Sequence, residues 1–187
     1  MRLDIIVRSV AGRLSLREPQ AESLRRLAAA LEAVPGLRDH HARSPEELAA
    51  MIGAMKALFP TLSDFERDFP SLCFALATGV GKTRLMGAFI SYLHAAYGYR
   101  HFFVLAPNLT IYDKLIGDLS PNSPKYVFKG IAEFASTAPE VITGDNYEQR
   151  GSLSLLGGIE VNIFNISKIN SEVRGGKSPK IKRLSEY

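Results

Sequence analysis

Residues 76–83, Leu-Ala-Thr-Gly-Val-Gly-Lys-Thr, combine glycine, lysine and threonine at a spacing that suits the binding of a triphosphate. Such a group concentrates negative charge, so a loop that binds it must offer backbone N–H groups and no bulky side chains. Gly79 and Gly81 permit the backbone conformations and the close approach that this requires. The pattern predicts that Lys82 reaches the β- and γ-phosphates and that the Thr83 hydroxyl ligates Mg²⁺. We therefore expect ATP and Mg²⁺ as cofactors, with Lys82 and Thr83 as the catalytic residues.

The flanking residues give this loop the context that a phosphate site needs. An apolar run at 72–77 predicts a strand before the loop, and the helical spacing at 84–97 predicts a helix whose N-terminus adds a favourable dipole. The strict pattern begins with glycine, whereas Leu76 stands in that position here. The alternative is a glycine-rich turn between a core strand and a core helix, with Lys82 as a surface residue. The nucleotide-binding residues expected in the loop are Thr78, Gly79, Val80, Gly81, Lys82, Thr83 and Arg84.

Composition and charge limit the class of protein. A chain of 187 residues that is 46% hydrophobic is long enough for one domain, or slightly more, with a sizeable core. Its net charge of +4 permits contact with nucleic acid without requiring it. No apolar run reaches the length of a membrane span, and Asp4, Arg8 and Arg13 interrupt any signal-peptide core. Cys73, the only cysteine, lies in the predicted strand, so we expect a buried thiol in a protein of the reducing cytoplasm.

Hydrophobic periodicity and turn residues indicate that helices and strands alternate. Helices are predicted around 24–31, where Pro35 and Gly36 terminate the pattern, and from a capping box at Ser44 up to Pro60. Asn108 is placed to cap another helix. Short strands are predicted at 3–10, 72–77, 101–106, 126–128, 141–143 and 159–164. This alternation predicts an α/β fold with a mostly parallel sheet and helices on both faces.

The order of these elements resembles the first part of a superfamily 2 helicase or translocase ATPase. It is most similar to the Res subunit of type III restriction enzymes and to related DEAD/DEAH-box-like proteins. Four stretches carry the resemblance: the loop at 76–83, Phe-Val-Leu-Ala-Pro-Asn at 103–108, Asn-Ile-Phe-Asn-Ile-Ser-Lys at 162–168, and Leu-Arg-Glu-Pro-Gln at 16–20. The resemblance spans nearly the whole chain, although only the loop motif is specific.

The resemblance implies a P-loop fold of the RecA type, DNA as a partner, and a modification methyltransferase as a further subunit. By position, Gln20 would hydrogen-bond adenine, while Pro107, Asn108, Asn165 and Ser167 would touch the nucleic-acid backbone. Ligands of parallel sheets bind at the carboxyl ends of the strands, where these last four residues are expected beside the phosphate loop. Simpler roles remain open: a surface glutamine at Gln20, a helix cap at Asn108, and turn residues at Asn165 and Ser167.

Two parts of such a motor are missing from the sequence. No acidic motif of the form Asp-Glu-x-His occurs, since Gly-Asp-Asn-Tyr at 144–147 does not match it, and no second RecA-like domain supplies arginine fingers. We expect an incomplete motor domain: a helical segment with the adenine-motif-like stretch at 1–70, then the first part of a RecA-like domain at 71–187, truncated before the acidic motif. Weak nucleotide binding and negligible turnover are expected. Basic residues from 168 onward predict a DNA-facing patch or a solvated face.

The functional hypothesis is the ATP-binding part of a DNA-dependent ATP hydrolase. Such a translocase or helicase would serve as the restriction subunit of a type III-like restriction–modification system, with any endonuclease site outside this sequence. Two other classes fit the same loop. One is a P-loop ATPase or kinase with no nucleic-acid role, and the other is a non-catalytic nucleotide-binding module.

Overall fold

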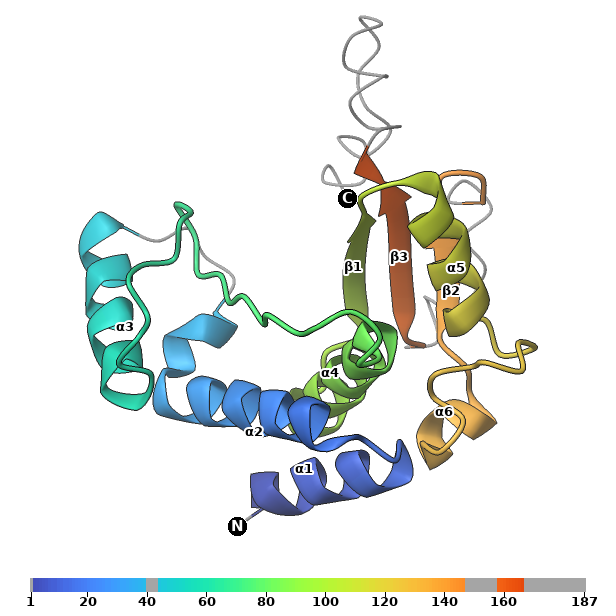
Figure 1. Ribbon diagram of the computed structural model, residues 1–187, viewed down its shortest axis with the longest axis horizontal. Helices are drawn as coiled ribbons and strands as arrows, with labels where there is room; N and C mark the ends of the chain where they lie inside the picture. Colours follow the sequence, from blue (N-terminus) through green and yellow to red (C-terminus); the bar gives the residue numbers. More distant parts are fainter. Residues whose placement is uncertain (1, 40–43, 147–157, 167–187) are drawn as a thin grey trace, which may run out of the picture.

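Helices and a small sheet follow one another along the chain. The computed structural model describes residues 2–39, 44–146 and 158–166. In Figure 1, α1 and α2 lie beneath α4, the strands rise beyond them, and α3 stands to one side. The elements are α1 (Arg2–Arg13), α2 (Glu18–Ala33), the 3-10 helix η1 (Pro35–Arg38), α3 (Pro45–Leu58), α4 (Lys82–Tyr97), β1 (His101–Ala106), α5 (Leu109–Leu119), α6 (Ala132–Ser136), β2 (Glu140–Thr143) and β3 (Glu160–Asn165).

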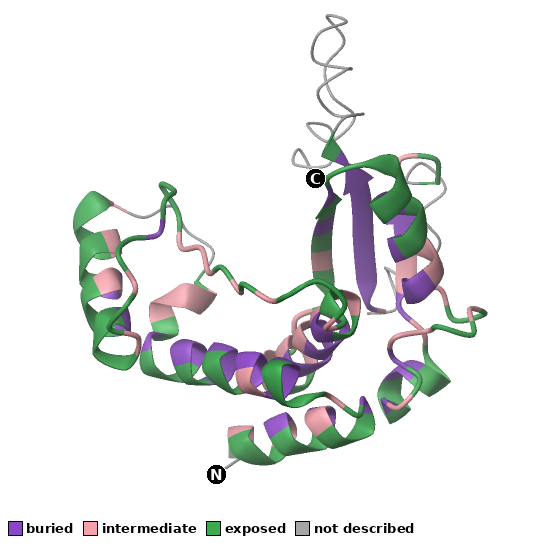
Figure 2. Cartoon of the chain, in the orientation of Figure 1, coloured by how far each residue is buried: buried purple, intermediate pink, exposed green. Residues whose placement is uncertain are grey.

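The described sheet is parallel and has the strand order β1-β3-β2. His101 and Glu140 both pair with Glu160, which sets the register of the three strands. Parallel neighbours need a crossover connection, and α5 lies in the connection between β1 and the other strands. The central strand β3 is buried along its whole length, as Figure 2 shows. The predicted α/β class with a parallel sheet is therefore confirmed.

The two faces of β1 differ in exposure. Val104 and Ala106 are buried, and α5 packs on β1 and β3. Successive side chains of a strand point to opposite faces, so Phe103 and Leu105 share the other face. These two side chains are 53% and 48% exposed. Phe103 stacks on Phe164 of the central strand, with ring centroids 5.4 Å apart, which partly covers the apolar surface of that face.

The predicted strand at 3–10 is wrong, because these residues form α1. Val7, Val10 and Leu14 are buried at helical spacing, in a core shared with α2 and α4. The β-branched residues that favour a strand instead supply one apolar face of an amphipathic helix. Burial against the neighbouring helices therefore outweighs the local preference for extended backbone.

The helices predicted around 24–31 and after Ser44 are confirmed as α2 and α3. Ser44 accepts a hydrogen bond from the Glu47 amide at 3.2 Å, and the Ser44 amide donates to the Glu47 carboxylate at 2.8 Å. This reciprocal pair satisfies amides that the start of a helix leaves without partners. Met51 and Met55 then bury one side of α3 in a second, smaller core with Ala30 and Val34.

The predicted strands at 72–77 and 126–128 are not strands in the structure. Residues 71–77 are extended but pair with none of the described strands, and 127–130 form a turn. Alternate residues of the first segment are partly buried, whereas Cys73 is exposed, so the prediction of a buried thiol is also wrong. An apolar run favours burial, but it supplies no partner for the backbone hydrogen bonds of a sheet.

Three further points complete the fold. Within the described ranges, no helix combines the length and the apolar character that crossing a membrane requires. The strands predicted at 101–106, 141–143 and 159–164 are confirmed as β1, β2 and β3. Ser167 and the basic stretch from 168 onward lie outside the described residues.

Replacement of Phe134 tests the packing beneath the sheet. Its ring is 1% exposed and meets Phe128 edge to face, with centroids 4.7 Å apart. We expect Phe134→Ala to lower the free energy of unfolding by about 3–5 kcal/mol. The control is Phe69→Ala, because Phe69 is 58% exposed and its loss should change stability by less than about 0.5 kcal/mol. Denaturant unfolding measures both variants, and equal effects would contradict this packing.

Candidate nucleotide-binding site

The glycine-rich loop has the backbone conformation that its sequence requires. Gly79 and Gly81 have φ angles of +82° and +96°, in the left-handed region that side chains disfavour. Gly81 is the residue that precedes the first turn of α4, and Lys82 begins that helix. The prediction that a turn rich in glycine leads directly into a helix is thus confirmed.

Backbone N–H groups gather at this helix start. Those of Gly79, Val80, Gly81 and Lys82 donate no hydrogen bond to another residue of the described ranges. The first amides of a helix have no partner within it, and the helix dipole places partial positive charge at the same point. These groups therefore form a set of donors suited to an anion such as a phosphate.

Gln20 of α2 supports the loop from behind. Its side chain is buried, and the amide nitrogen Nε2 donates to the Val80 carbonyl at 2.9 Å and to the Gly81 carbonyl at 2.8 Å. The N–H and C=O of a trans peptide unit point in opposite directions. Because Gln20 binds these two carbonyls, the N–H groups of Gly81 and Lys82, which belong to the same peptide units, are directed away from it. Gln20 thereby helps to orient the donors of the loop.

The structure gives Gln20 a role that the sequence motif did not indicate. Its oxygen Oε1 accepts from the Arg17 amide at 2.8 Å, at the start of α2. Both hydrogens of Nε2 and the oxygen are thus engaged within the protein. The alternative of an ordinary surface glutamine is wrong, because Gln20 is 1% exposed. Contact with adenine stays a prediction, and it would require Gln20 to release at least one of these bonds or to accept a second one at its oxygen.

The cationic side chains beside the loop donate hydrogen bonds to different parts of the protein. Lys82 is exposed, and its ammonium donates to the Ala77 carbonyl at 3.4 Å, folded back across the loop. Arg84 donates to the Leu14 carbonyl at 3.3 Å. Its guanidinium is therefore tied to the end of α1, and its predicted contact with nucleotide would need that bond to open. Lys82 is the residue that a phosphate in the loop can engage without disturbing another element.

Lys114 is a site residue that the sequence reasoning missed. Its ammonium, on α5, donates to the Thr83 hydroxyl at 3.1 Å and to the Asp118 carboxylate at 2.5 Å. Lysine and aspartate four residues apart on a helix predict a local ion pair, and that part of the signal was present. The contact with Thr83 joins α5 to α4 across the fold, so no local pattern could have indicated it.

The residues predicted to touch nucleic acid have different exposures. Pro107 and Asn108 are exposed after the carboxyl end of β1, whereas Asn165 ends β3 and is 1% exposed. Asn108 accepts a hydrogen bond from the Ile111 amide at 2.9 Å, which confirms its role as the cap of α5. Thr83, directly after the loop, accepts a hydrogen bond from Lys114 of α5, the helix that follows β1. Contact of the predicted residues with nucleic acid stays a prediction.

A cavity of about 620 Å³ adjoins the loop between α2, α3 and the coil that precedes α4. Apolar side chains form most of its walls, and charged residues of α2 stand at one side. Its lining residues are Pro19, Glu22, Ser23, Arg26, Ala30, Met55, Phe59, Thr61, Leu62, Leu72, Cys73, Phe74, Ala75, Leu76, Ala77 and Val80. The presence of Ala77 and Val80 shows that this cavity reaches the glycine-rich loop itself.

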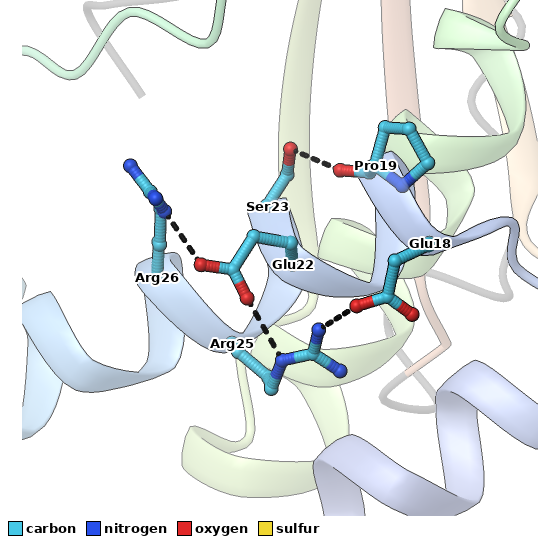
Figure 3. Close-up of polar contacts among 6 residues, drawn as sticks. All are labelled: Glu18, Pro19, Glu22, Ser23, Arg25 and Arg26. Carbon is cyan, nitrogen blue, oxygen red and sulfur yellow. Dashed lines mark hydrogen bonds and ion pairs between the residues drawn. The ribbon is translucent and has the colours of Figure 1, made fainter.

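Ion pairs along α2 fix the charges near the cavity, as Figure 3 shows. Glu22 pairs with Arg26 at 2.8 Å and with Arg25 at 3.0 Å, and Arg25 also pairs with Glu18. The hydrogen bond from Arg26, followed by that from Arg25, lowers the pKa of Glu22 below its usual range. Glu22 thus stays ionised at neutral pH, and its charge is balanced by its two arginine partners.

Substitutions of Gln20 test its support of the loop. Gln20→Glu keeps the shape but replaces the N–H donors by oxygen, which would face two carbonyls. Leaving buried polar groups without partners costs about 1–3 kcal/mol, so the free energy of unfolding should fall by that amount. The control is Ser23→Ala, which removes one hydrogen bond to the Pro19 carbonyl on the same helix and should have the smaller effect. Denaturant unfolding that ranks the two variants in the opposite order would contradict this role.

Substitution of Gly79 and of Gly81 by alanine distinguishes the cost of backbone strain from the cost of a steric clash with Gln20. Both positions incur about 1–2 kcal/mol of left-handed strain. A Cβ at Gly81 would also lie 2.7 Å from Nε2 of Gln20, whereas one at Gly79 would meet no atom within 4 Å. We expect Gly81→Ala to lower the free energy of unfolding more than Gly79→Ala does. The difference between the two losses of unfolding free energy should become smaller in the Gln20→Ala background, where the methyl group has room. An unchanged difference would rule out Gln20 as its cause.

Comparison with known proteins adds a family to this geometry. The model of the type III restriction enzyme, res subunit, matches residues 13–186. That match includes the loop, Gln20 and Lys114. No curated protein and no solved structure matches the chain with statistical significance. Because the family model covers most of the sequence, the chain belongs to the type III restriction enzyme res subunit family of helicase-like P-loop ATPases.

Proposed function

We propose that the chain binds ATP and Mg²⁺ through residues 78–83 and is the ATP-binding part of a DNA-dependent translocase or helicase. In this proposal the intact protein is the restriction subunit of a type III-like restriction–modification system. The observation that carries nucleotide binding is the set of backbone N–H groups from Gly79 to Lys82 at the start of α4, of which Gln20 directs those of Gly81 and Lys82 away from itself. Such donors at a helix N-terminus suit a phosphate group.

Each residue of the loop has a distinct task in this proposal. The backbone amides from Gly79 to Lys82 bind phosphate oxygens, and Lys82 exchanges the Ala77 carbonyl for the β- and γ-phosphates. Thr83 offers its hydroxyl to Mg²⁺, which supplies positive charge to the phosphates when it is bound. The donor set fits, because Mg²⁺ prefers oxygen and is held largely by phosphates and water, with few protein ligands. Within the described ranges, no cluster of three or more His, Cys, Asp or Glu residues could hold a metal by itself.

The nucleotide base would lie in the cavity beside the loop. Its volume of about 620 Å³ falls in the range of small-molecule sites, and Phe59, Leu62 and Leu72 give it apolar walls. Val80 lies both in the loop and at the cavity. A single nucleotide could therefore place its base in the cavity and its phosphates at the loop. Gln20 then serves this ligand by orienting the phosphate donors, with the contact to adenine as a separate proposal.

DNA contact is proposed at the carboxyl end of β1. Exposed Pro107 and Asn108 can meet a phosphodiester backbone there without reading its sequence. Asn165 pairs in register with Ala106, so its strand ends at the same edge, and Ser167 follows it. Buried Asn165 would act by shaping this edge. The family supports DNA as the partner, and a methyltransferase subunit is proposed from the family resemblance alone.

Nucleotide binding by the 187-residue chain tests the core of this proposal. Fluorescence titration with a labelled ATP analogue and Mg²⁺ should give weak, saturable binding. Lys82→Ala should reduce the affinity by about ten-fold or more, because removal of a charged partner costs about 1.5–3 kcal/mol. Lys56→Ala, an equal loss of charge on the exposed side of α3, is the matched control and should bind like the unaltered chain. Absence of saturable binding by the unaltered chain would overturn the proposal.

The DNA-dependent part has its own test. ATP hydrolysis by the intact protein should rise when DNA is added, and Lys82→Ala should abolish the rise. Single-stranded and duplex DNA are compared in separate reactions, since a preference between them distinguishes a strand-separating helicase from a duplex translocase. Nucleotide binding without any response to DNA would reject the motor and leave a P-loop enzyme or a nucleotide-binding module.

A further inference from the structure

Lys114 of α5 contacts both Thr83 of α4, the proposed Mg²⁺ ligand, and the carboxylate of Asp118 on its own helix. Its ammonium lies 3.1 Å from the Thr83 hydroxyl and 2.5 Å from the Asp118 carboxylate. The Asp118 side chain is 11% exposed, whereas that of Lys114 is 52% exposed. The carboxylate is thus fixed in the protein, and the long lysine side chain reaches from it toward the first turn of α4.

This arrangement places a positive charge beside the oxygen that the proposed function assigns to Mg²⁺. A hydroxyl that accepts from an ammonium still has a second lone pair, but two cations around one oxygen repel each other. Mg²⁺ bound at the Thr83 hydroxyl would therefore repel the Lys114 ammonium from its place beside that oxygen. The ion pair with Asp118 gives the ammonium a partner on its own helix when its bond to Thr83 is lost.

We propose that Lys114 is a positioning residue of the nucleotide site, and that it places a positive charge beside Thr83 in the absence of metal. This inference rests on the proposed binding of nucleotide at residues 78–83. Its ammonium attracts the phosphates of metal-free ATP and competes electrostatically with Mg²⁺. Lys114 therefore makes nucleotide affinity less dependent on Mg²⁺ than the loop alone would make it.

A purely structural role for the same contacts leads to a different expectation. If Lys114 only joined α5 to α4, its loss would weaken nucleotide binding equally with and without Mg²⁺, or would only lower stability. The ratio of the two affinities would then stay constant. This ratio is the quantity that separates the two roles, because a general loss of folded protein affects both affinities alike.

The experiment titrates a fluorescent ATP analogue into the 187-residue chain, once with excess Mg²⁺ and once with EDTA. In Lys114→Met we expect the metal-free affinity to fall, and the ratio of Kd without Mg²⁺ to Kd with Mg²⁺ to rise by about ten-fold over the unaltered chain. Lys114→Arg restores the charge and should return the ratio toward its original value. Lys56→Met makes the same chemical change on α3, at an exposed lysine, and should leave the ratio unchanged.

The outcomes separate this inference from the proposed function. Binding by the unaltered chain that depends on Lys82, with the same ratio in Lys114→Met, overturns the role of Lys114 and leaves nucleotide binding intact. No saturable binding by the unaltered chain overturns nucleotide binding itself. If circular dichroism shows that Lys114→Met does not fold, Lys114→Gln replaces it, since glutamine removes the charge and retains polar contacts. A raised ratio in that variant supports the inference, and an unchanged one rejects it.

Discussion

The contact between Gln20 and the glycine-rich loop is the interaction on which the geometry of the candidate site depends. It joins α2 to a loop that lies 60 and 61 residues later in the chain. One side chain binds two successive carbonyls and so determines the direction of two successive amides. The N-terminal helices are thus part of the candidate site. A division of the chain near residue 70 would separate the loop from the residue that supports it.

The positively charged side chains around the loop differ in how strongly protein partners hold them in place. Arg84 is bound to the carbonyl that follows α1, and Lys114 is paired with a buried carboxylate. Lys82 has the longest hydrogen bond of these, at 3.4 Å. A phosphate that enters the loop therefore meets one readily available cation and others that must first give up protein partners. This order follows from packing between helices, which brings α1 and α5 to the first turn of α4.

Local features of the site could be predicted from the sequence, because they depend on neighbours along the chain. Left-handed Gly79 and Gly81, the helix that starts at Lys82 and the cap at Asn108 all follow from short patterns. Long-range contacts could not be predicted in this way. The stretch at 16–20 indicated Gln20 as a residue of the nucleotide site, but its hydrogen bonds to the Val80 and Gly81 carbonyls depend on the packing of α2 on α4 and could not be read from that stretch. Tertiary burial also explains α1, where an apparent strand forms a helix.

The exposed thiol of Cys73 has a practical consequence for spectroscopy. It is the only cysteine of the chain, and it lines the cavity next to the glycine-rich loop. A thiol-reactive dye or spin label would therefore attach at one defined position without prior removal of other cysteines. Because that position borders the space proposed for the base, the label would sense the polarity and crowding of the cavity directly. The unpaired, extended backbone of residues 71–77 thus provides a natural attachment point for an optical probe of this site.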